Sequence, residues 1–197
     1  MIVISNPTEI VNETNIIHAL FEEGMELCHI RKPNYSIEEL RSFLSAINSS
    51  YYSKLVLHQH HELAEEFQIK RLHFTEKERL TKPVKLSKPD NYKFLSTSVH
   101  SIEDFNELSD AFDYAFLSPV YPSISKQNYR PTKNTFEEIK KRNNQHTKLI
   151  ALGGISHEDI EEVLCNGFDD FALLGSIWKA KNPVKNLKKC LKIVHSF

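Results

Sequence analysis

The chain has 197 residues, of which 40% are hydrophobic, and a formal net charge of −1 from 25 basic and 26 acidic residues. A chain of this length can bury the core of one domain, and we expect a single domain over residues 1–197. The balanced charge gives no electrostatic basis for binding nucleic acid or an anionic membrane, so any anionic ligand must be held by a local site.

The three cysteines, Cys28, Cys165 and Cys190, lack paired or CxxC spacing. This pattern predicts reduced thiols and excludes a disulfide framework or a zinc knot. The first residues lack the basic region of a signal peptide, and no apolar run approaches the length of a membrane span. The sequence therefore predicts a cytoplasmic protein without a membrane partner.

Short apolar runs alternate with segments of helical periodicity along the chain, which favours βαβ units and a parallel sheet. The expected strands cover residues 1–5, 26–30, 54–57, 69–74, 114–117, 148–152 and 171–174, and a further strand begins at residues 94–96. The expected helices include residues 9–23, a helix capped by Ser36, and residues 62–67, 102–108, 136–142 and 183–194.

The segment 75–91 is polar, contains Pro83 and Pro89, and is too short for an ordinary βα unit. We therefore expect its helix to be degraded or missing. The predicted fold class is α/β, a compact (β/α)₈ TIM barrel with an abbreviated fourth βα unit, somewhat shorter than the roughly 250 residues typical of this fold.

Four of the five glycines fall within residues 150–177, at the ends of the seventh and eighth expected strands and in the turn between them. Glycine at the end of a buried strand lets the backbone approach a ligand, and the free N–H groups of a following helix favour an anion. In (β/α)₈ barrels these two loops commonly bind phosphate. The predicted phosphate-binding residues are Gly154, Gly175, Ser176 and Ile177. The alternative is a pair of ordinary tight turns.

Basic and imidazole side chains gather at the carboxyl ends of the second to fifth expected strands, the face where barrel chemistry occurs. These residues are His29, Arg31, Lys32, His58, His73, Ser98 and His100. Because successive strand residues alternate sides, we expect only one of Arg31 and Lys32 to point inward. His73 and His100 are equally compatible with a site or with a packing role, and His60 and His61 are assigned to a surface turn or the start of a helix.

The segment Ser-Ile-Ser-Lys at residues 123–126 follows the sixth expected strand. Ser123 and Ser125 offer neutral donors and Lys126 a point charge, which suits a phosphate or diphosphate. The alternative is a solvated loop. A zinc interpretation of the histidines is disfavoured, because they show no HxH or HExxH spacing and no acidic residue stands at the relevant strand ends, so no metal ligands are predicted.

Together these segments resemble the thiamine phosphate synthase/TenI superfamily over nearly the whole chain. The corresponding motifs are HIRKP (29–33), HQ (58–59), HFTE (73–76), STSVH (96–100), SPVYPSISK (118–126), GGI (153–155) and LGSI (174–177). Each motif is weak alone, but seven in family order on successive strands identify the fold and the family.

The departures from the family pattern concern the diphosphate half of the site. The resemblance implies an Asn-Asp pair after the third strand, with the Asp helping to hold Mg²⁺, and this chain has His58 and Gln59 there. His29 replaces a glutamine, Pro33 stands where a second basic residue is expected, and Glu76 or Glu78 could replace the acid after the fourth strand only with a shift of the loop.

The resemblance implies three functions. The expected one is a TenI-type thiazole tautomerase that binds a thiazole phosphate, with His29 or His58 moving the proton and Arg31 and Lys126 supplying charge. The first alternative is thiamine phosphate synthase, which couples a pyrimidine diphosphate to thiazole phosphate and would use Mg²⁺. The second is a regulator that binds thiamine phosphate without turnover. The resemblance also implies a possible homodimer, and no cofactor is otherwise certain.

Overall fold

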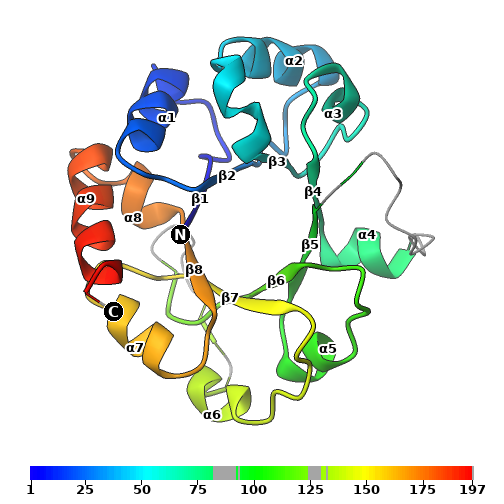
Figure 1. Ribbon diagram of the computed structural model, residues 1–197, viewed down its shortest axis with the longest axis vertical. Coiled ribbons are helices and arrows are strands. Elements are labelled where there is room, and N and C mark those ends of the chain that lie inside the picture. The colour runs from blue at the N-terminus through cyan, green and yellow to red at the C-terminus, as the bar shows by residue number, and fades with distance from the viewer. Residues whose placement is uncertain (82–91, 93, 124–129, 132, 197) are drawn as a thin grey trace.

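Eight parallel strands close into a barrel in chain order, each strand hydrogen-bonded to the next and the eighth to the first. The computed structural model describes residues 1–81, 92, 94–123, 130–131 and 133–196 (Figure 1). The strands are β1 (Ile2–Ile4), β2 (Leu27–Ile30), β3 (Leu55–Leu57), β4 (Arg71–Phe74), β5 (Phe94–Val99), β6 (Tyr114–Leu117), β7 (Lys148–Leu152) and β8 (Asp170–Leu173). The predicted (β/α)₈ barrel is confirmed.

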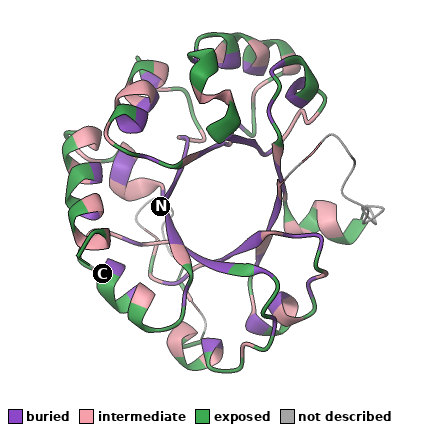
Figure 2. Ribbon diagram, in the orientation of Figure 1, coloured by how far each residue is buried: buried purple, intermediate pink, exposed green. Residues whose placement is uncertain are grey.

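Helices surround the barrel, and most of them turn buried residues toward it, whereas α4 has none (Figure 2). They are α1 (Glu13–Glu22), α2 (Ile37–Ser45), α3 (Leu63–Glu66), α4 (Glu76–Thr81), α5 (Ile102–Asn106), α6 (Thr135–Ile139), α7 (Ile160–Cys165), α8 (Gly175–Trp178) and α9 (Pro183–Val194), with a 3₁₀ helix η1 at Ser49–Lys54. None of the helices in these described ranges is long and apolar enough to cross a membrane.

The fourth helix was expected to be degraded or missing, but α4 is present with six residues, and residues 82–91 of the same unit lie outside the described residues. Other connecting helices are equally brief, with four residues in α3 and five in α5. The chain is therefore short for a (β/α)₈ barrel because several of its connecting helices are short, and not because one unit is missing.

Local sequence signals account for the helix boundaries. Ser36 accepts a hydrogen bond from the Glu39 N–H, and the Glu39 carboxylate accepts one from the Ser36 N–H, which forms a capping box at the start of α2. Asn182 caps α9 through the Lys185 N–H, and Pro183 occupies the first turn, where its missing N–H costs no hydrogen bond.

Side chains of each strand alternate between two apolar layers. On β6, Ala115 and Leu117 belong to the large layer between barrel and helices, whereas Tyr114 and Phe116 point into the barrel. The interior apolar cluster is completed by Ile2, Ile4, Ala172 and Ile150, from β1, β7 and β8. The interior of the barrel is therefore apolar on the side of β1 and β6 to β8. The side chains that β2 to β5 turn into the barrel are of another kind.

Lys32 lies outside the barrel mouth in a buried ion pair with Glu13 of α1. The Lys32 side chain is fully buried, and its ammonium lies 4.9 Å from the Phe43 ring centroid and 5.3 Å from that of Tyr35. The same ammonium donates to the Thr8 carbonyl at 3.2 Å. This pair joins the loop after β2 to α1, and it explains why Lys32 is the member of the Arg31–Lys32 pair that points away from the barrel axis.

We predict that Glu13→Gln lowers the free energy of unfolding by about 3–5 kcal/mol, because it leaves the Lys32 charge buried without its partner. Urea unfolding measures the change. Glu137→Gln is the matched control, since it removes a carboxylate from an exposed pair with Lys140 and should leave stability nearly unchanged. Similar losses in both variants would contradict the structural role of the buried pair.

Candidate ligand cavity at the carboxyl end of the barrel

A cavity of about 420 Å³ opens at the carboxyl ends of the strands. Its wall combines apolar residues with imidazole, hydroxyl and charged side chains and with glycine backbone. The lining residues are Ile4, Arg31, His58, His73, Thr75, Glu76, Lys77, Ser98, His100, Phe116, Ser118, Ser123, Leu152, Gly153, Gly154, Ile155, Ala172, Leu174 and Gly175. A concave site of this size with convergent polar groups is typical of a small-molecule site.

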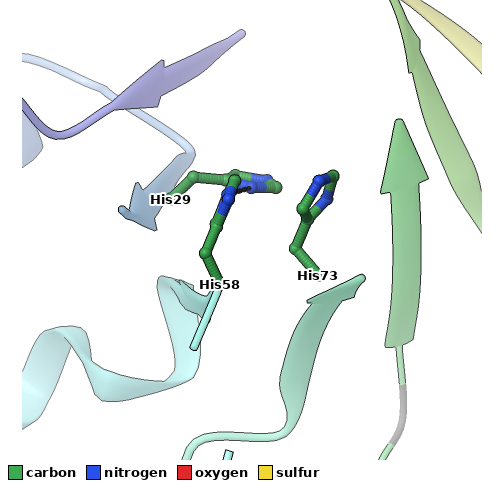
Figure 3. Close-up of side chains that lie close together, drawn as sticks. All are labelled: His29, His58 and His73. Atoms are coloured by element: carbon green, nitrogen blue, oxygen red, sulfur yellow. Dashed lines mark hydrogen bonds between the residues drawn. The ribbon is translucent and has the colours of Figure 1, made fainter. Parts of the chain in front are cut away.

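Three buried histidines from successive strands, His29, His58 and His73, meet at the inner end of this cavity (Figure 3). His29 pairs in register with Val56. His58 follows β3 two residues beyond Val56 and is therefore nearer to the mouth. Leu57 pairs with Leu72, so His58 and His73 lie at the same level, and their rings stack with centroids 4.1 Å apart.

A continuous hydrogen-bond network connects this histidine cluster to the barrel wall. His29 Nδ1 lies 2.8 Å from His58 Nε2, and His29 Nε2 lies 2.7 Å from the Tyr114 hydroxyl. His73 Nδ1 and Nε2 lie 2.9 Å and 3.0 Å from the hydroxyls of Ser96 and Ser98. The polar side chains that line the barrel interior along β2 to β5 thus form hydrogen bonds with one another and with Tyr114 of β6.

The imidazoles of the cluster are held in their neutral form. Burial lowers the pKa of His29 and His58 well below the usual value, and burial lowers the pKa of His73 to about 3. Neighbouring imidazoles act in the same direction, as does the Arg31 charge on His58 and His73. A neutral imidazole can accept a proton or bind a metal ion, but its conjugate acid here is stronger than that of an ordinary histidine.

The lowered pKa values predict acid destabilisation. Below pH 6.5 the unfolded chain protonates these histidines while the folded cluster stays neutral, down to about pH 3 at His73. The unfolded state then holds more protons, so stability is complete above pH 6.5 and falls as the pH drops, by about 1.4 kcal/mol per pH unit for each histidine.

Chemical unfolding between pH 4 and 8, in buffer with a chelator, measures this slope. His73→Asn should flatten it, whereas substitution of the exposed His195 by Gln should not. An unchanged slope in His73→Asn would contradict the assigned cause.

The glycine turn after β7 forms the opposite edge of the cavity and is sealed against the loop after β6. Gly153 and Gly154 have φ values of +102° and +74°, which favour glycine. A Cβ atom on Gly154 would lie 2.5 Å from the Pro122 carbonyl oxygen. The loop is also tied to β7 by hydrogen bonds from the Val120 and Tyr121 N–H groups to the carbonyls of Leu152 and Gly153, both 3.0 Å.

The turn after β8 leads directly into α8. Gly175 lines the cavity, and the buried Ser176 hydroxyl has no hydrogen-bond partner among the described residues. The Ile177 side chain is fully buried, and its N–H donates to the Leu174 carbonyl at 3.1 Å. Of the four predicted phosphate-binding residues, Ile177 is therefore the one whose N–H is already used within the turn.

The structure brings most of the predicted site residues to one cavity. Those that line it are Arg31, His58, His73, Ser98, His100, Ser123, Gly154 and Gly175. His29 lies deeper, behind His58, and Lys32 pairs with Glu13 away from the cavity. Ser125 and Lys126 lie outside the described residues, so their predicted role stays a prediction.

Several residues that line the cavity or support it were not assigned a role from the sequence. Lys77 and Thr75 line the mouth at the start of α4, the segment expected to be degraded, next to Glu76, which the sequence offered only as a replacement acid. Tyr114 and Ser96 were read as strand residues, yet they hold His29 and His73. Period-two alternation along β5 and β6 could have identified Ser96 and Tyr114 as inward-facing. The sequence around Lys77 contains no motif that would identify it as a cavity residue.

The fold and the cavity define a class, (β/α)₈-barrel proteins with a ligand site at the carboxyl ends of the strands. Within this class, the family model described as "Thiamine monophosphate synthase" matches residues 1–177. The chain therefore belongs to the thiamine monophosphate synthase family, as the motifs indicated.

Curated relatives named thiamine-phosphate synthase match at modest identity. The Streptococcus suis protein is 32% identical over 99 residues, which are 49% of this chain and 43% of the relative. The Caldicellulosiruptor bescii protein is 22% identical over 186 residues, 92% of this chain and 84% of the relative. The chain spans about half the length, or less, of two of these relatives. The match covers 43% of the Streptococcus suis protein and 48% of the thiamine-phosphate synthase from Anoxybacillus flavithermus.

Solved structures extend the comparison to the whole chain. The thiamine phosphate pyrophosphorylase from Bacteroides thetaiotaomicron superposes with a TM-score of 0.78 at 29% identity, covering 99% of this chain and 97% of that one. The thiamine phosphate pyrophosphorylase from Pyrococcus furiosus has a TM-score of 0.80 at 18% identity, covering 99% and 95%, and supports the fold alone.

Proposed function

We propose that this chain is a thiamine phosphate synthase, which joins a pyrimidine diphosphate to a thiazole phosphate and releases pyrophosphate. In this reaction the C–O bond to the diphosphate breaks, pyrophosphate leaves with the electron pair, and a C–N bond forms to the thiazole nitrogen. The observation that carries the proposal is a single cavity that offers glycine backbone on one edge and cationic side chains on another. A reaction between two phosphorylated substrates needs both.

The two edges suit the two substrates. Gly154, Gly175 and Ser176 would hold the thiazole phosphate through backbone N–H groups, and the unpartnered Ser176 hydroxyl offers a further donor there. Arg31 and Lys77 line the same cavity and would neutralise the charge that develops on the leaving diphosphate. Ser98 and Ser123 add hydroxyl groups to the wall, and Ser125 and Lys126 are proposed for the same half of the site.

The tautomerase interpretation has less support, for a physical reason. Proton transfer near neutrality is most efficient with a base whose pKa is near the working pH. The pKa values of His29, His58 and His73 are all lowered by burial, and His29 lies behind His58. These imidazoles are poor general bases, so the charge chemistry of the synthase fits the cavity better.

The Mg²⁺ ion that the synthase alternative implies does not fit the side chains present. Mg²⁺ prefers oxygen ligands, usually one or two carboxylates with water and substrate phosphate. His58 offers imidazole nitrogen at the expected position, and the buried Gln59 Nε2 lacks a hydrogen-bond partner among the described residues. Glu78 instead accepts hydrogen bonds from the Thr75 N–H and hydroxyl, at 2.8 Å and 2.7 Å, which leaves Glu76 as the carboxylate lining the described part of the cavity.

The first experiment is an assay of pyrophosphate release with both substrates, with and without MgCl₂. We expect release that requires both substrates. Tight binding of thiazole phosphate without release would favour the non-catalytic regulator, and isomerisation of a thiazole carboxylate phosphate would restore the tautomerase interpretation. Either result would refute the synthase proposal.

Arg31→Ala tests the cationic edge. Removing a charged hydrogen-bond donor should weaken binding of the pyrimidine diphosphate by about 10- to 100-fold, measured by calorimetry, and leave binding of thiazole phosphate much less affected. Arg41→Ala is the matched control, since Arg41 pairs with Glu66 on the exposed surface of α2. Equal effects of Arg31→Ala on both ligands would show that the two halves of the site are not separate.

A further inference from the structure

The histidine cluster has the composition of a metal site. His29, His58 and His73 each offer one ring nitrogen, and these nitrogens all lie within 4.8 Å of one another. Imidazole nitrogens on a tetrahedral zinc ion lie about 3.3 Å apart, given Zn–N distances of about 2.0–2.1 Å. The His29–His58 separation of 2.8 Å is already near this value. Because the His58 and His73 rings are stacked with their centroids 4.1 Å apart, placing all three nitrogens around one ion requires these rings to rotate and the third nitrogen to move by about 1–2 Å.

Two of the three histidines have the surroundings of metal-bound imidazoles. A ligating histidine normally uses its second ring nitrogen in a hydrogen bond that fixes its orientation. His29 has the Tyr114 hydroxyl at 2.7 Å, and His73 has the Ser96 hydroxyl at 2.9 Å. The three side chains come from β2, from the residue directly after β3 and from β4, and they lie close together (Figure 3), so the barrel fixes the positions of their backbones.

The cluster is also accessible from one side. His58 and His73 line the cavity, whereas His29 is fully buried behind them. Three protein ligands with a fourth position open to a cavity is the arrangement of zinc ions that bind an exchangeable ligand. Because Arg31 also lines the cavity and no carboxylate belongs to the cluster, an anion is the most favourable fourth ligand.

We propose that His29, His58 and His73 form a binding site for a divalent transition-metal ion of the zinc type, with an open position that faces the cavity and takes an anion. The site is distinct from the oxygen-ligated Mg²⁺ that the family resemblance implies. It uses nitrogen ligands that favour Zn²⁺, Co²⁺ or Ni²⁺ over Mg²⁺. The inference does not depend on the proposed reaction, because binding is measured without substrates.

The test is calorimetric titration of the chelator-treated protein with ZnCl₂ and, separately, with MgCl₂. We expect one Zn²⁺ per chain with micromolar or tighter affinity and no Mg²⁺ binding at the same concentrations. Co²⁺ then serves as a spectroscopic probe, and a buried tetrahedral site should give intense visible absorption that changes when azide is added. Failure of the wild-type protein to bind Zn²⁺ would overturn the proposal.

Variants separate this site from surface histidines. His58→Ala should weaken Zn²⁺ binding at least 100-fold and abolish the visible absorption of the Co²⁺ protein. His100→Ala, which changes an exposed histidine of the same cavity outside the cluster, should retain both. Circular dichroism verifies that each variant is folded, and if His58→Ala is not, His73→Gln replaces it. Zn²⁺ binding that survives in a folded cluster variant would assign the metal to the surface and contradict the proposal.

Discussion

Closure of the barrel is the constraint on which the rest of the structure depends. Eight short strands turn every second side chain into a space without water, and each must be apolar or hydrogen-bonded. On one side of this interior the side chains are apolar, among them Ile2, Ile4, Phe116 and Ile150. On the other side the side chains are imidazoles and hydroxyls. They form hydrogen bonds with one another, because each of these groups can both donate and accept. The polar half is thus part of the core and, at its outer end, part of the ligand cavity.

Much of the fold follows from local pattern. The strands at 114–117 and 148–152 and the helix at 183–194 match the expected ranges, because apolar runs, Asn caps and proline act over a few residues. β5 begins at Phe94 as expected and continues through Ser98 to Val99, an end that the sequence did not indicate. The inward-facing residues of this strand include Ser96 and Ser98, so an apolar pattern does not reveal its full length. Likewise α1 begins at Glu13 and not at residue 9, because Asn12 adopts a left-handed conformation there.

The site was predictable in outline and not in detail. Alternation indicated that only one of Arg31 and Lys32 would face inward, but the choice depends on Glu13, a residue on another element. The histidine cluster was harder to foresee. Spacing motifs detect ligands on one helix or hairpin. His29 and His73 lie on β2 and β4 and His58 directly follows β3, so the three meet only through the register of these strands. A change of register by one residue would turn a side chain to the other face.

The contact between the glycine turn after β7 and the loop after β6 has a consequence for the two substrates of the proposed reaction. Because the Gly154 backbone packs directly on Tyr121 and Pro122, and two hydrogen bonds join the loop to β7, a ligand that displaces one segment also displaces the other. The glycine turn borders one half of the cavity, and the loop carries Ser123 into the other. If the two edges hold the two substrates of the proposed reaction, this contact would couple their binding and would favour an ordered sequence over two independent events.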